Sequence, residues 1–138
     1  MDINIIRLLF DAGLVVLIWM IQLVVYPSFL FYKKKDLVEW HKKYTISISY
    51  IVIPLMLGQL VLGLQQTIVS FNLFTIIYFL LVLCNWGITF FIFVPLHGKI
   101  SSGIYKDFLL NKLVSYNWAR TTIWTIILTL SIYEISVV

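Results

Sequence analysis

Four long apolar runs, separated by short polar stretches, make up most of the chain. They cover residues 8–31, 46–64, 73–96 and 113–137. A helix needs about 20 apolar residues to cross a bilayer, and each run is of that order. Because an isolated strand would leave its backbone groups unpaired in lipid, the runs are expected to be helical. The pattern predicts an all-α fold, an integral membrane four-helix up-down bundle that forms a single transmembrane domain over residues 1–138.

Composition supports the same class of protein. Of the 138 residues, 62% are hydrophobic and only 12% are charged, which is too little polar surface for a soluble globule of this size. Four spans use almost the whole length, so no room remains for a soluble catalytic domain. The single cysteine, Cys84, excludes an intramolecular disulfide.

Lysines mark two of the three connections between the runs. These lysines are Lys33, Lys34, Lys35, Lys42, Lys43, Lys99, Lys106 and Lys112. The connection of residues 65–72 and the C-terminal tail carry no Lys or Arg. By the positive-inside rule, both basic loops are expected in the cytoplasm and both termini on the outer side of a cell membrane that the chain crosses several times. Topology and anionic lipid headgroups then explain the net charge of +4, and nucleic acid is not an expected partner.

Several polar side chains are expected at one depth in the inner leaflet. At about 1.5 Å of rise per residue, Arg120 lies roughly 10 Å inside the start of the fourth run, and Gln22 and Tyr26 lie at a similar depth from the end of the first. Asn117, Arg120 and Trp124 share one helical face, because they lie three and then four residues apart. The sequence therefore predicts a polar pocket, open to the inner leaflet, in which these five residues bind a small lipophilic, aromatic or anionic ligand.

Arg120 is the only arginine that hydropathy places inside a run, where a guanidinium is expensive to bury. Two interpretations are open. The side chain extends along the helix to the cytoplasmic headgroups, or it faces the bundle and binds a carboxylate or phosphate with two N–H groups. No acidic residue lies at its depth, so in the second case a ligand would supply the anion. Near the outer surface, Arg7 and Asp11 are four residues apart and are expected to form a local ion pair.

The two histidines of the chain, His41 and His97, lie at the same membrane border. Two imidazoles from different helices can bind a metal ion or a haem iron, and near neutral pH an imidazole can act as a general base in catalysis. Tyr44, three residues after His41, is expected to line the same pocket. Ordinary solvated histidines at the membrane surface are the alternative. The cofactor is open at this point, with haem as the candidate.

Short motifs along the chain resemble those of a group of small bacterial four-span membrane proteins. They are Trp19-x-x-Gln22-x-x-x-Tyr26-Pro27-x-Phe29, Trp40-His41-x-x-Tyr44, Pro54-Leu55-Met56, Val94-Pro95-Leu96-His97 and Asn117-Trp118-x-Arg120-Thr121. The last is similar to a motif of the anthrone-oxygenase-like membrane proteins, whose members oxidise polycyclic aromatic substrates or have no assigned activity. A weaker resemblance, at Tyr26-Pro27 and residues 54–64, is to the bacterial membrane protoporphyrinogen oxidase, which implies haem. Where that family has a histidine in its first helix, this chain offers Gln22 and Tyr26.

Two functions from different classes are consistent with the sequence. In the first, the chain is a membrane protein with an inner-leaflet ligand pocket, an oxidoreductase if it is an enzyme, with His41 and His97 as catalytic or metal-binding groups. The alternative is a non-catalytic lipid-binding or assembly module, in which the same polar residues join helices to one another. Membrane lipids are expected partners in both cases, and so is a second copy of the chain.

Overall fold

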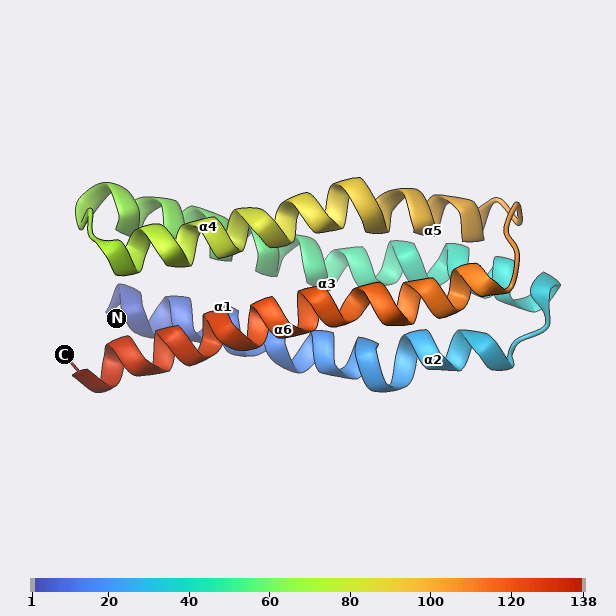
Figure 1. The fold of residues 1–138 in the computed structure, drawn as a ribbon, viewed down its shortest axis with the longest axis horizontal. Coiled ribbons are helices and arrows are strands. Elements are labelled where there is room, and N and C mark those ends of the chain that lie inside the picture. The colour runs from blue at the N-terminus through green and yellow to red at the C-terminus, as the bar shows by residue number, and fades with distance from the viewer. Residues whose placement is uncertain (1, 138) are drawn as a thin grey trace.

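The computed structural model describes residues 2–137, and all of their regular structure is helical (Figure 1). The first rod consists of α1 (Ile3–Met20), a π-helical turn (Ile21–Val25), α2 (Tyr26–Ser28) and a short 3-10 turn (Phe29–Phe31). The second is α3 (Lys34–Val69). The third consists of α4 (Leu73–Ile88), a second π-helical turn (Thr89–Phe93) and α5 (Val94–Ser101). The fourth is α6 (Phe108–Val137). The prediction of an all-α fold is confirmed.

The four rods lie side by side, and the chain reverses direction at each connection, so that the N and C labels lie at one end of Figure 1. α1 packs against α3 and α6, and α4 packs against the same two helices, which closes the four rods into a ring. Apolar side chains such as Leu14, Val82, Leu113 and Ile127 are buried along its axis. The core is therefore a long narrow column, and the functional side chains have to be sought along it.

Three of the rods are long and apolar enough to cross a membrane, by length and composition: Ile3–Phe31, Lys34–Val69 and Leu73–Ser101. This finding supports the membrane class. α6 is of similar length, but Arg120, Glu134 and several hydroxyl side chains interrupt its apolar sequence, and it is not among the three. Crossing of the membrane by α6 and the sidedness of the loops remain predictions.

The outer surface of the bundle is apolar in a way that fits lipid as its solvent. Large apolar side chains are exposed on all four rods, among them Val16, Leu23, Tyr50, Val61, Leu80, Phe91, Ile126 and Ile132. Soluble monomers rarely expose apolar surface on this scale.

Three helices begin earlier than the apolar runs predicted. α1 starts at Ile3 instead of near residue 8, α3 at Lys34 instead of near residue 46, and α6 at Phe108 instead of near residue 113. The first turns of all three helices carry polar residues, so hydropathy does not detect them. As a result, His41 and Tyr44 lie inside α3, seven and ten residues after its start, and the helix fixes the directions of their side chains.

Two prolines mark the places where the first and third rods depart from α-helical geometry. A π-helical turn directly precedes the Tyr26-Pro27 pair, and the other directly precedes Val94-Pro95. Proline has no N–H, and its ring crowds the carbonyl four residues earlier, so a wider turn before it relieves both problems. The extra residue shifts the side chains on either side of each turn around the helix axis, and Tyr26 and Phe93 are both buried.

Close packing of α1 on α3 depends on Gly58. A Cβ at this position would lie 2.1 Å from the ring of Phe10, whereas a Cβ at Gly87 would meet no atom within 4 Å. Both Gly58→Ala and Gly87→Ala should gain the higher helix propensity of alanine, but only the alanine at position 58 would clash with a neighbouring side chain. Gly58→Ala should therefore have a free energy of unfolding about 1–2 kcal/mol lower than that of Gly87→Ala. Unfolding of the two variants in mixed detergent micelles measures the difference, and equal stabilities would contradict this packing.

Candidate functional site

The site is centred on the guanidinium of Arg120, which points into the bundle from α6 and is 6% exposed. Its Nε and Nη2 donate to Oδ1 of Asn117 at 3.0 and 2.7 Å, and Nη2 also donates to the hydroxyl of Tyr26 at 3.0 Å. The ring of Phe93 lies against the guanidinium, with 3.6 Å from Cζ to the ring centroid, as in a cation–π contact. Of the two orientations expected for Arg120, the structure shows the inward one, and its side chain does not extend to the headgroups.

Asn117 connects this guanidinium to the first rod. Its Nδ2 donates to Oε1 of Gln22 at 2.9 Å, and Thr121 donates to the same oxygen at 3.2 Å. Gln22 completes its bonds by donating to the carbonyl of Val114 at 3.1 Å. These bonds hold α6 against the π-helical turn of the first rod, so the backbone irregularity and the polar layer stabilise one another.

From Tyr26 a chain of hydrogen bonds runs toward the basic loops. The Tyr26 hydroxyl is 2.9 Å from Nε2 of His97, whose Nδ1 is 2.8 Å from Nε2 of His41. Nδ1 of His41 is in turn 2.8 Å from the hydroxyl of Ser101. His41 is fully buried and packs edge-on against Phe29. The first, second and third rods each contribute to this chain of four side chains.

The histidine pair is not arranged as two ligands of one tetrahedral metal ion. All four ring nitrogens already have protein hydrogen-bond partners. A tetrahedral ion about 2.0–2.1 Å from each nitrogen would also hold the two facing nitrogens roughly 3.3 Å apart, farther than the 2.8 Å between His41 and His97. Within residues 2–137 no group of three or more His, Cys, Asp or Glu residues could hold a metal ion. In this arrangement the two imidazoles bond to each other, and the binding of a metal or haem by His41 and His97 stays a prediction.

A cavity of about 420 Å³ lies beside this network, between α3 and the third rod. Its wall runs from Tyr44 to Met56 along α3 and from His97 to Trp86 along the third rod. The lining is mostly apolar, and its polar members are Tyr26, Tyr44, Thr45, Ser49, Thr89, His97 and Arg120. Most of these polar groups lie toward the basic loops, whereas Met56 and Trp86 lie toward the middle of the bundle. The cavity thus has a polar end and an apolar end.

The mouth of the cavity is on the lateral surface. Ile53 of α3, Phe90 of the π-helical turn and Val94 of α5 all line the cavity and are all about half exposed, at 51, 54 and 53%. These side chains lie on the surface that lipid would cover. The cavity therefore opens on the side of the bundle, between α3 and the third rod.

The structure brings together most of the predicted site residues. Gln22, Asn117 and Arg120 form the network with Tyr26, His97 and His41, and Tyr44 lines the cavity. Trp124 lies next to the network but not in the cavity wall: its ring centroid is 6.0 Å from Cζ of Arg120, and its indole N–H donates to Oε1 of Gln59 at 3.1 Å.

The sequence interpretation missed three members of the site, Thr89, Phe93 and Ser101. They lie eight and four residues before His97 and four residues after it. Nη1 of Arg120 is 3.4 Å from the hydroxyl of Thr89, so this contact is long. Regular helical spacing from His97 could have found Ser101, whereas Thr89 and Phe93 belong to the π-helical turn, where that spacing does not hold.

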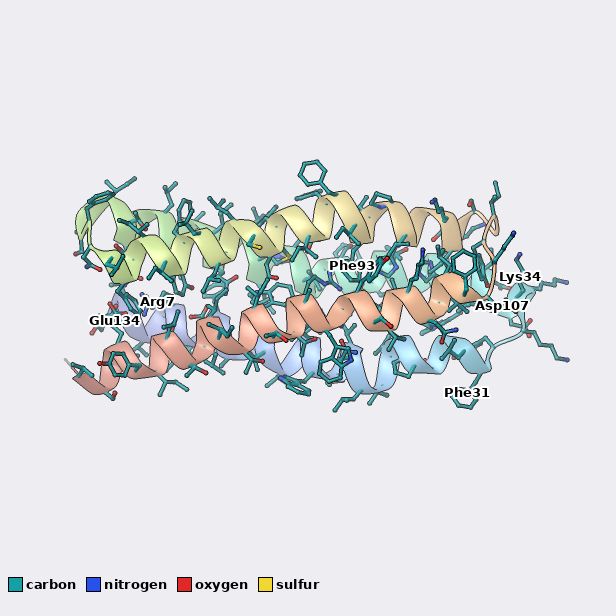
Figure 2. The ribbon with its side chains drawn as sticks, in the orientation of Figure 1. Arg7, Phe31, Lys34, Phe93, Asp107 and Glu134 are labelled. Carbon is teal, nitrogen blue, oxygen red and sulfur yellow. The ribbon has the colours of Figure 1, made fainter. Side chains whose placement is uncertain are left out.

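A second polar cluster, near the chain termini, overturns the expected Arg7–Asp11 pair. Arg7 is fully buried within the first rod, forms its ion pair with Glu134 of α6 and donates to Oε1 of Gln66. Figure 2 shows Arg7 and Glu134 close together at the end of the bundle that holds both termini. The Tyr78 ring packs against the Arg7 guanidinium, 4.7 Å from Cζ to its centroid.

Both carboxylate oxygens of Asp11 accept hydrogen bonds from neutral side chains. Its Oδ1 accepts from Gln59 at 2.6 Å and from Tyr78 at 2.8 Å, and its Oδ2 accepts from Ser131 at 2.6 Å. Three other helices thus supply the partners of this carboxylate, which is why the residue four positions earlier, Arg7, pairs with a distant acid instead.

Comparison of the chain with protein-family models, with curated proteins and with solved structures finds no match. The functional conclusion therefore rests on the geometry of the site.

The hydrogen bonds to Asp11 join α1 to three other helices, so we expect its side chain to stabilise the fold. Asp11→Asn should lower the free energy of unfolding by about 1–3 kcal/mol, because an amide offers one acceptor oxygen to three donors and turns a new N–H toward one of them. Glu39→Gln is the matched control, since Glu39 is exposed on α3 and the same acid-to-amide change there should have little effect. Detergent unfolding curves compare the two, and an Asp11→Asn protein as stable as Glu39→Gln would contradict this structural role.

Proposed function

We propose that the protein is a multi-pass cell-membrane protein that binds a lipophilic ligand with an aromatic body and an anionic head group in the cavity between α3 and the third rod. The head group would lie at the polar end, beside Arg120, Tyr26 and His97. The aromatic body would lie among Trp86, Phe90 and other apolar lining residues.

The observation that carries this proposal is the uncompensated charge of Arg120. Its protein partners are the neutral groups of Asn117, Tyr26 and Thr89, and the one ion pair within residues 2–137 is Arg7–Glu134. A buried guanidinium without an acid is unfavourable in a bilayer, and an anionic ligand would neutralise it. Because Arg120 lines the cavity, such a ligand would have direct access to it.

An unpaired polar atom at the apolar end supports a ligand that carries a second polar group. The indole N–H of Trp86, which lines the cavity, is buried and has no acceptor within residues 2–137. Buried polar groups in proteins nearly always have a partner, so an oxygen on the ring system of the ligand would supply the acceptor that the Trp86 N–H lacks.

The position of the cavity along the bundle favours the inner leaflet. His97 and Tyr44 lie within a few turns of the basic connections, and Figure 2 shows Lys34 and Asp107 at that end, opposite the termini. With the basic loops in the cytoplasm and the termini outside, the cavity would open to the cytoplasmic half of the bilayer. The resemblance to anthrone-oxygenase-like proteins implies a polycyclic aromatic ligand, which would supply the aromatic body that the cavity requires. If the protein is an enzyme, the same resemblance implies an oxidoreductase.

A non-catalytic lipid-binding or assembly module is the second candidate. It is favoured by the bonds of Asn117, Thr121 and Gln22, which join α6 to the first rod without any ligand. Under this alternative the cavity would hold a lipid chain, and the charge of a head group would not matter.

A pair of probes separates these two candidates: an alkyl-substituted 4-nitrophenol, at a pH where it is ionised, and its methyl ether. The phenolate should bind the purified protein in lipid nanodiscs, and the ether should bind at least about tenfold more weakly, because a bond to a charged donor contributes about 1.5–3 kcal/mol. Arg120→Gln should remove the preference for the phenolate, and Arg120→Lys should reduce it, since lysine keeps the charge without the planar fork.

Lys106→Gln is the control for general charge, since Lys106 is exposed in a basic connection. It should leave both affinities unchanged. Equal binding of phenolate and ether to the wild-type protein, or full phenolate preference in a folded Arg120→Gln or Arg120→Lys protein, would favour the lipid-binding module instead.

A further inference from the structure

The hydrogen-bonded chain between the cavity and the basic loops has properties that binding alone does not require. Two of its members, Tyr26 and His97, line the cavity, whereas His41 and Ser101 do not. Every link is short, at 2.9, 2.8 and 2.8 Å from Tyr26 to Ser101. Every member can both accept and donate a proton: a phenol, two imidazoles and an alcohol.

Arg120 sets the direction of this chain. A guanidinium can only donate, so the Tyr26 oxygen accepts from Nη2 and its own proton is free to go to Nε2 of His97. His97 then carries its proton on Nδ1 and donates to Nε2 of His41, which carries its proton on Nδ1 and donates to the Ser101 hydroxyl. All donors are thus assigned without conflict, and they point from the cavity toward the basic loops.

The chain ends near the protein surface on one side only. Ser101 is partly exposed and is the last residue of α5, next to the connection at residues 102–107. In the other direction, the ring of Trp124 lies 6.0 Å from the Arg120 guanidinium and its N–H is bonded to Gln59. Across residues 2–137, no hydrogen bond links the Arg120 network with the Asp11 cluster beyond it. Protons could therefore leave the cavity toward the basic loops but not toward the termini.

We propose that Tyr26, His97, His41 and Ser101 form a proton relay that takes the proton of an acidic ligand from the cavity to the basic-loop face. This inference rests on the proposed function, because it needs an acid, such as a phenol, bound beside Arg120. A neutral acid enters readily from lipid, and it must lose its proton to become the anion that Arg120 binds.

Each proton moves by one position in this relay. The ligand hydroxyl gives its proton to the Tyr26 oxygen, Tyr26 gives its own to Nε2 of His97, and Nδ1 of His97 gives its proton to Nε2 of His41. Nδ1 of His41 then protonates the Ser101 hydroxyl, which releases its original proton to water. The ligand loses one proton, water gains one, and each side chain ends with as many as it had. Tyr26 and His97 touch the ligand, and His41 and Ser101 act through them as positioning and relay groups.

The same alkyl-substituted 4-nitrophenol tests the relay, because only its phenolate absorbs visible light. With the probe bound in nanodiscs, a flash that releases protons from a caged acid into the water should be followed by loss of the phenolate colour. The reversed relay carries these protons inward. His41→Phe keeps a ring without nitrogens at a position outside the cavity wall, and it should slow the colour change by at least about tenfold, as expected when a positioned acid–base group is lost.

Ser101 supplies a matched pair of variants. Ser101→Ala should slow the response, and Ser101→Thr, which keeps the hydroxyl, should restore it. A merely structural role would not follow the hydroxyl in this way. Ser102→Ala is the control, because Ser102 is exposed and donates to the Lys99 carbonyl outside the relay, and its response should equal that of the wild-type protein.

Failure of the relay and failure of the binding site give different results. If the probe binds and folded His41→Phe responds as fast as the wild-type protein, the relay is overturned while the binding site stands. If the wild-type protein does not bind the probe, which the absorbance shows before any flash, the proposed function is overturned and the relay with it.

Discussion

The site depends on the hydrogen bonds between the side-chain oxygen of Asn117 and the buried guanidinium of Arg120. Oδ1 of Asn117 accepts from both Nε and Nη2 of Arg120, which fixes the plane of the guanidinium three residues away on the same helix. Hydrogen bonds to charged groups contribute about 1.5–3 kcal/mol each, so these two bonds offset part of the cost of burying the guanidinium inside the bundle. With the plane fixed, the remaining Nη2 proton reaches Tyr26, and Tyr26 orients His97. The other half of the Asn117 amide binds Gln22, so the same residue also fixes the first rod.

The two arginines of the chain show what this arrangement implies. Arg7 has an acid, Glu134, as well as an amide and two aromatic rings, so its charge is balanced within the protein. Arg120 has comparable burial and likewise two aromatic rings, Phe93 and Trp124, but only neutral acceptors. Both arginines hold a buried guanidinium between helices, but only Arg120 lines a cavity and has no acidic partner within residues 2–137. That difference separates a structural cluster from a candidate binding site more clearly than burial or residue type does.

Local rules predicted part of this molecule, and long-range geometry decided the rest. Apolar runs and a helical spacing of three and four residues were enough to predict the helices and to group Gln22, Tyr26, Asn117 and Arg120 at one depth. Partners from distant segments were out of reach: the spacing of Arg7 and Asp11 predicted a local pair, whereas the structure pairs Arg7 with a residue 127 positions away. The direct bond between His41 and His97 was missed for the same reason, since sequence places both at one border without saying that their rings meet.

The two π-helical turns explain why even helical spacing was an incomplete guide to the cavity. Each inserts one extra residue before a proline, and this rotates the helix before the turn relative to the helix after it. Thr89 and Phe93 begin and end the second turn, and Tyr26 comes directly after the first, so the groups around Arg120 come from just those stretches where a regular helical wheel fails. Irregular backbone within a membrane is tolerated where it is buried in protein or borders a cavity, and π-turns occur often at functional sites. The two turns thus bring Tyr26, Thr89 and Phe93 together with Arg120 in the wall of one cavity, the place where the proposed ligand would bind.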